Sequence, residues 1–222
     1  MWKKEQVASL TDTAALKPFM TDRDIIEACR IGKKFRVATV IVRPTDVPLA
    51  VRELSGSGVK AGCTIGFPHG CNQPEVKALE AKMALEQGAE EVDMVMNIGK
   101  FLSGDFNFVK RDIEGVVSEA KRMEGLVKVI LEICYLSKDQ IIKACEIARD
   151  TGADFVKTST GFGDGSATPE AVDIMIKTVG DVMGVKAAGG IRTWETAVGY
   201  LNQGCKRLGI VAIEDVLKGA PE

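Results

Sequence analysis

Short apolar runs alternate with amphipathic segments along almost the whole chain. Runs rich in β-branched residues, such as residues 36–42 (RVATVIV) and 127–133 (VKVILEI), are typical of buried parallel strands. Between these runs, apolar residues recur at helical spacing, and many of the segments end at a glycine. The pattern predicts strands at residues 10–12, 36–42, 61–67, 91–98, 127–133, 153–157, 185–190 and 207–211.

Capping residues mark the beginnings of the predicted helices. Thr21, three residues before Asp24, has the spacing of a capping box, in which each residue satisfies a free backbone N–H of the first turn. The clearest helix begins at a proline and ends at a glycine. Its Val76, Leu79 and Met83 form one apolar stripe, the pattern of a helix that packs on a sheet.

Alternating strands and helices predict a parallel sheet. With residues 10–12 counted as a strand, the chain has the eight strands that close a TIM (β/α)8 barrel, an α/β fold. No linker of low complexity interrupts the 222 residues, so we expect residues 1–222 to form a single domain. If residues 10–12 are not a strand, an open doubly wound sheet of seven strands remains possible.

Composition excludes several classes of partner. The net charge is −2 and the two signs are interspersed, which argues against a surface that binds nucleic acid. No apolar run is long enough to cross a membrane, and residues 1–6 lead into no signal-peptide core, so we expect a cytoplasmic protein. The six cysteines form no Cys-x-x-Cys pair and are expected to be reduced, small hydrophobic side chains. The single histidine, His69, excludes a multi-histidine zinc site.

Ionisable residues interrupt several of the apolar strands. They are Asp93, Lys128, Glu132, Lys157 and Lys186. In a parallel barrel the carboxyl ends of the strands form the active face, so charges there favour a functional interpretation. Two structural interpretations compete. Lys157 could pack its stem at a strand edge with its head in water, or Asp93 could form a structural ion pair with one lysine. A single pair would leave the second lysine without a carboxylate.

Two lysines beside one carboxylate suit Schiff-base chemistry. A lysine has an ordinary pKa of about 10.4 and is almost wholly protonated at pH 7, so it is a poor nucleophile. Partial burial and a neighbouring ammonium can lower the pKa to about 7–8. Lys157 would then be the nucleophile and Lys186 the cation that keeps it neutral. Asp93 would hold Lys186 and take part in proton transfer, directly or through a water.

Long segments of the chain resemble the deoxyribose-phosphate aldolases, which are class I (Schiff-base) aldolases on a TIM barrel. The similarity runs from Asp12 to about Gly209. It is carried by Gly66-Phe67-Pro68, Glu75-Val76-Lys77, the run from Glu91 to Gly99 (EVDMVMNIG), the run from Phe155 to Phe162 (FVKTSTGF) and the run from Val185 to Thr193 (VKAAGGIRT).

The resemblance implies reversible cleavage of 2-deoxyribose 5-phosphate to acetaldehyde and glyceraldehyde 3-phosphate. It places the Schiff-base lysine at Lys157, the second lysine at Lys186 and the proton-relay aspartate at Asp93. It also implies that neither a metal nor an organic cofactor is needed, and that the partners are small aldehydes and sugar phosphates, with a homodimer or homotetramer as the assembly. The substrate-binding residues it implies are Asp12, Thr158, Thr160, Gly161, Gly189, Gly190 and Gly209.

Two segments depart from the family pattern. Asp12-Thr13-Ala14 keeps the aspartate but lacks the hydroxyl at the third position. Gly209 is followed by Ile210-Val211-Ala212, where the family has small hydroxyl residues that bind the substrate phosphate. Backbone N–H groups at Gly190 and Gly209 could still hold a phosphate. Two alternatives therefore stay open: the same chemistry on unphosphorylated or other aldehydes, and a barrel that binds a sugar phosphate without turning it over.

Overall fold

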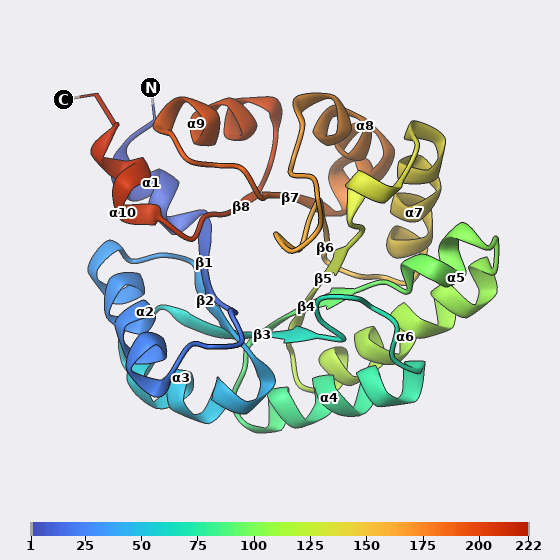
Figure 1. Cartoon of the computed structure of the whole chain (residues 1–222), viewed down its shortest axis with the longest axis horizontal. Coiled ribbons are helices and arrows are strands. Elements are labelled where there is room, and N and C mark those ends of the chain that lie inside the picture. The colour runs from blue at the N-terminus through green and yellow to red at the C-terminus, as the bar shows by residue number, and fades with distance from the viewer. Residues whose placement is uncertain (1, 222) are drawn as a thin grey trace.

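Eight parallel strands close into a barrel in the computed structural model of the chain, which describes residues 2–221 (Figure 1). Each strand pairs with the next one in sequence, and β8 pairs with β1. The strands are β1 (Thr11–Ala15), β2 (Thr39–Val42), β3 (Lys60–Ile65), β4 (Glu91–Val95), β5 (Leu126–Ile130), β6 (Phe155–Lys157), β7 (Gly184–Ala188) and β8 (Arg207–Gly209). The predicted TIM barrel is confirmed. The open seven-stranded alternative is wrong, because β1 is a strand with a neighbour on each side.

Helices surround the barrel, so that the apolar outer faces of the strands are covered (Figure 1). The α-helices are α1 (Lys4–Ser9), α2 (Asp22–Phe35), α3 (Val47–Leu54), α4 (Pro74–Glu86), α5 (Ile98–Leu102), α6 (Phe106–Arg122), α7 (Lys138–Asp150), α8 (Pro169–Val179), α9 (Trp194–Gln203) and α10 (Ile213–Lys218). The 3₁₀ turns are η1 (Pro44–Asp46), η2 (Ile133–Tyr135) and η3 (Gly180–Val182). The described helices do not include one that is long and apolar enough to span a membrane.

The predicted capping boxes are formed. The backbone N–H of Thr21 donates to Asp24 Oδ2 at 2.6 Å, and α2 begins at the next residue. The strand predicted at residues 36–42 is shorter than expected, because Arg36 ends α2 in the left-handed conformation (φ 53°). Val37 is nevertheless buried, so its apolar side chain belongs to the core although its backbone belongs to the connection.

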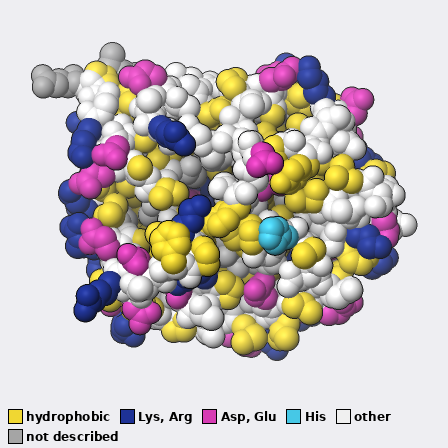
Figure 2. Space-filling view, in the orientation of Figure 1, with side chains coloured by type: hydrophobic (Ala, Val, Ile, Leu, Met, Phe, Trp, Pro, Cys, Tyr) yellow, Lys and Arg dark blue, Asp and Glu magenta, His cyan; other side chains and the backbone are white. Residues whose placement is uncertain are grey.

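The apolar stripe of α4 faces solvent, contrary to the sequence-based expectation. Val76, Leu79 and Met83 are 49%, 56% and 50% exposed, and yellow side chains lie along the lower edge of Figure 2, where Figure 1 places α4. The buried side of α4 carries two alanines, a leucine and a lysine instead, and α4 packs along α6. That lysine, Lys77, is fully buried and donates to Asp112 Oδ2 at 2.6 Å.

The register of the strands places charges side by side inside the barrel. Asp93 on β4 pairs with Lys128 on β5, and Lys157 on β6 pairs with Lys186 on β7. Residues paired across parallel strands project from the same face of the sheet. The closed barrel therefore brings the predicted catalytic residues into one interior.

Candidate active site

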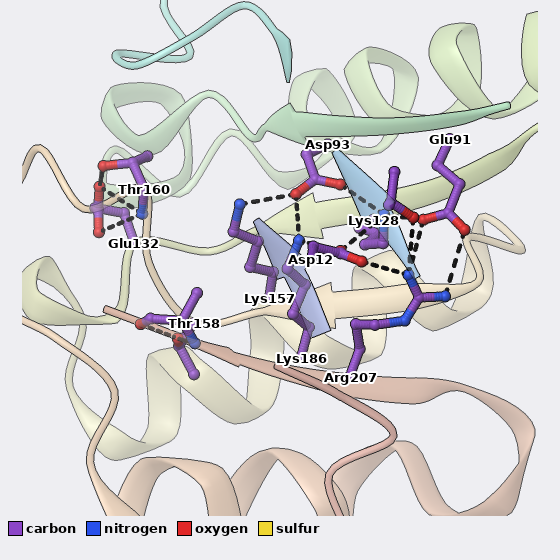
Figure 3. Close-up of polar contacts among 12 residues, drawn as sticks. Asp12, Glu91, Asp93, Lys128, Glu132, Lys157, Thr158, Thr160, Lys186 and Arg207 are labelled. Carbon is purple, nitrogen blue, oxygen red and sulfur yellow. Dashed lines mark hydrogen bonds and ion pairs between the residues drawn. The ribbon is translucent and has the colours of Figure 1, made fainter. Parts of the chain in front are cut away.

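Asp93 lies at the centre of a group of buried amines (Figure 3). Its Oδ2 accepts hydrogen bonds from Lys157 Nζ and Lys186 Nζ, each at 2.8 Å. Its Oδ1 accepts from Lys128 Nζ at 2.9 Å. The two amines on one oxygen lie within a few ångströms of each other, as the sequence predicts. The single structural pair considered as an alternative is therefore wrong, because three lysines share this carboxylate.

Below Asp93, toward the amino-terminal ends of the strands, the interior is closed by a second set of charges. Glu91 and Arg207 are the first residues of β4 and β8, and Arg207 Nη1 donates to Glu91 Oε2 at 3.0 Å. Lys128 Nζ donates to Glu91 Oε2 at 2.6 Å. Asp12 joins the two sets: its Oδ2 accepts from Lys186 and its Oδ1 accepts from Arg207. These carboxylates are at most 1% exposed, so no bulk water screens the charges.

The environment of Lys157 lowers its pKa to about 8. Burial is the largest cause, since it disfavours the charged amine; the Asp93 carboxylate opposes it and the Lys186 ammonium reinforces it. At pH 7 a lysine with this pKa is neutral in about a tenth of the molecules, against less than a thousandth at the ordinary value. The amine can therefore act as a nucleophile without any histidine nearby.

The carboxylates of the site stay ionised. Burial by itself would raise the pKa of Asp93, but the positive charges of Lys128, Lys157 and Lys186 outweigh it and hold that pKa well below its ordinary range. Burial likewise opposes the ionisation of Asp12, whose pKa the neighbouring cations lower to about 2. The pKa of Lys128 is raised despite its burial, because Asp12, Asp93 and Glu91 all surround it.

A cavity of about 360 Å³ opens above Lys157 at the carboxyl ends of the strands. The single histidine, cyan in Figure 2, follows β3, so the face shown there is the one that carries these strand ends; that face is hollowed near its centre. The predicted residues that line the cavity are Asp12, Lys157, Thr160, Gly161, Lys186, Gly189, Gly190 and Gly209. The cavity is thus deep enough to lead from solvent to the nucleophile.

Two predicted residues lie at the site without lining the cavity. Asp93 is fully buried beneath the amines. Thr158 is also fully buried, and its hydroxyl donates to Ala188 O at 2.9 Å and accepts from Ala188 N at 3.0 Å. The Thr158 side chain therefore ties β6 to β7, the two strands that carry the paired lysines.

Glu132 fixes the loop that follows Lys157. It has a left-handed backbone (φ 53°), and its carboxylate accepts from both the backbone N–H and the hydroxyl of Thr160 (Figure 3). The hydroxyl of Thr160 in turn accepts from Phe162 N at 2.9 Å. The predicted substrate contact at Thr160 is thereby part of a rigid turn at the cavity wall.

Sequence reasoning missed Glu91 and Arg207 and gave Lys128 and Glu132 no role. One signal was available: Glu91 lies two residues before Asp93, so both side chains point to the same face of β4. No such signal marks Arg207, since its partners Asp12 and Glu91 are brought to it only when the barrel closes.

The loop after β8 has the apolar character that its sequence predicts. Ile210, Val211 and Ala212 line the cavity, so this part of the wall offers no side-chain hydroxyl. In the adjoining loop after β7, Gly189 and Gly190 have positive φ (87° and 74°), a backbone conformation that side chains disfavour. Residues 2–221 contain no group of three or more His, Cys, Asp or Glu side chains placed to hold a metal ion.

Known proteins share this chain's sequence and fold. The family model described as "DeoC/LacD family aldolase" matches residues 10–207. A deoxyribose-phosphate aldolase of Thermococcus gammatolerans is 49% identical over 216 residues, covering 96% of each chain. One from Clostridium perfringens is 45% identical, covering 97% of this chain and 96% of the relative. The tetrameric deoxyribose phosphate aldolase of Aeropyrum pernix superposes with a TM-score of 0.90 at 33% identity, covering 97% of this chain and 91% of that one.

These matches extend over the barrel strands that carry Asp93, Lys157 and Lys186. Together with the closed barrel and its buried lysines, they show that the chain belongs to the DeoC/LacD family of aldolases.

Proposed function

We propose that the protein cleaves 2-deoxyribose 5-phosphate reversibly to acetaldehyde and glyceraldehyde 3-phosphate, through a Schiff base on Lys157. The observation that carries this proposal is the position of the Lys157 amine, which is buried at the end of β6, faces the cavity and has a pKa of about 8. The relatives named deoxyribose-phosphate aldolase support the choice of substrate.

The first step joins sugar and enzyme. The neutral Lys157 amine attacks C1 of the open-chain sugar, and loss of water leaves a protonated imine. Asp93 Oδ2, which lies 2.8 Å from Nζ, is placed to stabilise the positive charge that the imine retains. Lys186, which shares the same carboxylate oxygen, raises the fraction of Lys157 that is neutral before the attack.

The second step breaks the C2–C3 bond. Removal of the C3 hydroxyl proton drives the cleavage, the bonding electrons move into the imine to form an enamine, and glyceraldehyde 3-phosphate leaves. The enamine then takes a proton at C2, and hydrolysis of the resulting imine releases acetaldehyde. Lys186 and Asp93 are the proton-transfer groups nearest to Lys157 Nζ, acting directly or through a water.

The cavity wall supplies the remaining contacts of the proposal. Gly161, Gly189, Gly190 and Gly209 line it without side chains, so a substrate can approach their backbone N–H groups. Thr160 presents a fixed polar edge beside Lys157. We assign Asp12 to holding Lys186 and Thr158 to holding β7 rather than to direct substrate contact, because their polar atoms already have partners.

Reductive trapping tests the proposal. Borohydride reduction in the presence of acetaldehyde is expected to leave a stable adduct on Lys157, located by peptide mass spectrometry, and Lys157→Met is expected to lose both the adduct and the cleavage activity. Lys206→Met is the matched control, since Lys206 is an exposed lysine in the connection between α9 and β8. No adduct on Lys157 would overturn the mechanism and favour a barrel that binds without turnover.

The second candidate function is the same chemistry on unphosphorylated aldehydes. The apolar wall at residues 210–212 favours it, since lost hydrogen bonds to a charged group weaken binding by about 1.5–3 kcal/mol each. Rates of cleavage of 2-deoxyribose with and without its 5-phosphate decide between the two candidates. A preference for the bare sugar would replace the first candidate with the second.

We also infer a homodimer or homotetramer that uses the exposed stripe of α4. Glu75 and Lys82 flank the stripe, and two antiparallel copies of α4 would bring each Glu75 near the Lys82 of the other copy. The tetrameric relative from Aeropyrum pernix supports an assembled state. Leu79→Lys is expected to lower the sedimentation coefficient, whereas Val182→Lys, at an exposed position on η3, is expected to leave it unchanged. Equal sedimentation of wild type and Leu79→Lys would exclude this interface.

We further propose that the chain is one domain and that it acts in the cytoplasm. The closed ring of strands from β1 to β8 supports a single folding unit, for which one cooperative unfolding transition is expected. All six cysteines are unpaired, which fits a reducing compartment. Subcellular fractionation tests the location.

A further inference from the structure

Lys17 lies at the rim of the active-site cavity and its ammonium has an aromatic partner. Nζ lies 4.3 Å from the centroid of the Phe162 ring, a cation–π contact between the β1–α2 and β6–α8 connections. Both residues line the cavity that contains Lys157. The contact thus joins two loops across the entrance to the nucleophile.

The backbone of Lys17 is fixed, whereas its charge has no ion-pair partner. Arg43 donates to the carbonyl oxygens of Lys17 at 3.0 Å, Pro18 at 3.3 Å and Met20 at 3.0 Å. Arg43 is itself oriented by Asp46, at 2.6 Å. Across residues 2–221, no carboxylate lies within ion-pair distance of Lys17 Nζ. The loop therefore presents an uncompensated positive charge at a defined place.

The Phe162 ring is fixed as well. Its backbone N–H donates to Thr160 Oγ1, which Glu132 holds, and its ring packs edge-on against Phe67 with centroids 5.1 Å apart. An exposed contact between a lysine and a phenylalanine ring is a weak interaction. A charge-assisted hydrogen bond from an ammonium to a phosphate is stronger, so an anion in the cavity would displace the ring as the partner of Lys17.

The neighbouring loop after β8 explains why such a cation is needed. Residues 210–212 offer no hydroxyl, so an anionic group held there would depend on backbone N–H donors, on the Ser166 hydroxyl beside Gly189 and Gly190, and on the exposed Arg192. A lysine on a flexible stem acts as a point charge that can follow the anion without a fixed geometry. Lys17 can supply the charge compensation that the apolar loop lacks.

We propose that Lys17 is a specificity-determining residue. Its ammonium moves away from the Phe162 ring and binds the phosphate group, at the end of the substrate remote from the aldehyde. The inference rests on the proposed function, because it assigns the recognition of the phosphorylated substrate over the bare sugar. It makes Lys17 a binding residue and gives it no part in bond cleavage.

Steady-state kinetics of Lys17→Met on both sugars test the inference. KM for 2-deoxyribose 5-phosphate is expected to rise about tenfold with kcat nearly unchanged, while KM for 2-deoxyribose stays the same. Lys17→Arg is expected to keep most of the affinity. Lys143→Met is the matched control, because Lys143 also lies over a phenylalanine ring, that of Phe106, and is remote from the cavity lining. Equal changes in KM for the two sugars, or no change for the phosphorylated one, would overturn the inference.

A binding measurement separates this inference from the proposed function. Titration calorimetry with inorganic phosphate is expected to show about tenfold weaker binding by Lys17→Met than by wild type, whether or not either sugar is cleaved. A wild-type protein that cleaves neither sugar would overturn the proposed function, and this calorimetric difference would still support the anion site. Unchanged phosphate affinity in Lys17→Met would overturn the role of Lys17.

Discussion

The two ends of the barrel interior hold buried lysines whose pKa values are shifted in opposite directions. Lys157, at the carboxyl end, has a pKa lowered to about 8, whereas Lys128, nearer the amino end, has a raised pKa. Burial disfavours both charges, since Lys128 is completely buried and Lys157 is 5% exposed. The difference lies in their partners. Lys128 is surrounded by Asp12, Glu91 and Asp93, while Lys157 has only Asp93, which it shares with two other lysines.

The local ratio of carboxylates to amines sets the direction in which the pKa of a buried lysine shifts in this barrel. The amino end is a neutralised network, with Arg207 and Lys128 facing Glu91 and Asp12. The carboxyl end has an excess of amines, and both Lys157 and Lys186 line the cavity there. Substitutions can therefore be made at each end separately. Those at the amino end should change the stability of the fold, and those at the carboxyl end should change the activity.

The largest expected effect is on stability, at the amino end. Glu91→Gln removes one carboxylate from Lys128 and Arg207, and the loss of one partner from a buried charge network costs about 3–5 kcal/mol in the free energy of unfolding. We expect Tm to fall by roughly 10 °C or more. Thermal denaturation against Glu90→Gln, an exposed neighbour, measures it.

The stability difference should depend on pH in a defined sense. The folded state lowers the pKa of Glu91 from 4.5, because the cations outweigh its burial. Its stabilising effect is therefore complete above about pH 4.5 and is lost as the pH falls through the folded-state value. A difference between wild type and Glu91→Gln that persists undiminished in strong acid would contradict this account. The pH at which activity rises is expected to be the same in Glu91→Gln as in the wild type.

An intermediate effect is expected at the carboxyl end. Lys186→Met removes an ammonium beside Lys157. It also makes Lys157 the single lysine that donates to Asp93 Oδ2, and both changes raise the pKa of Lys157. We expect kcat/KM at pH 7 to fall by about 100-fold, which is about 2.7 kcal/mol of transition-state stabilisation. Part of the lost activity should return at alkaline pH. Lys206→Met serves as the exposed control, and an unchanged pH profile of Lys186→Met would remove Lys186 from the control of Lys157.

The smallest expected effect is the pH dependence of the wild type. Because Lys157 must be neutral to attack, kcat/KM should fall about tenfold for each pH unit below about 8 and level off above it. The rate of adduct formation in the borohydride experiment should follow the same curve. A profile that is flat between pH 6 and pH 9 would show that protonation of Lys157 does not limit the reaction.

Local sequence was sufficient for most of the fold. The alternation of apolar runs and capped helices predicted eight strands in the correct order, and the short first segment proved to be the strand that closes the ring. The errors were of two kinds. Strands were predicted to be too long where apolar residues such as Val37 are buried outside the sheet. The buried face of α4 was predicted wrongly, because it carries small residues, Leu85 and the ion pair of Lys77 with Asp112 on α6, while the apolar stripe faces solvent.

The candidate site was predicted unevenly. Lys157, Lys186 and Asp93 are recognisable because a charge in an apolar strand is conspicuous and expensive to bury. Arg207 was not recognisable, since it begins a short strand and meets its partners only in the closed barrel, and Glu132 was noted as a charge without a role. Thr158, predicted to bind substrate, bonds to the neighbouring strand, a contact that exists only once β6 and β7 are paired.

The sequence by itself determined the period of the elements, the number of strands and the residue types available for imine chemistry, because these depend on local propensity and on the cost of burying a charge. Only the tertiary structure decided that the pKa of Lys157 is lowered while that of Lys128 is raised. Lys128 and Lys157 both lie in apolar strands, and the opposite shifts of their pKa values arise because the closed barrel surrounds Lys128 with carboxylates from β1 and β4 and leaves Lys157 with Asp93. Electrostatic interactions act through space, so the assignment required the distances between residues that are far apart in the chain.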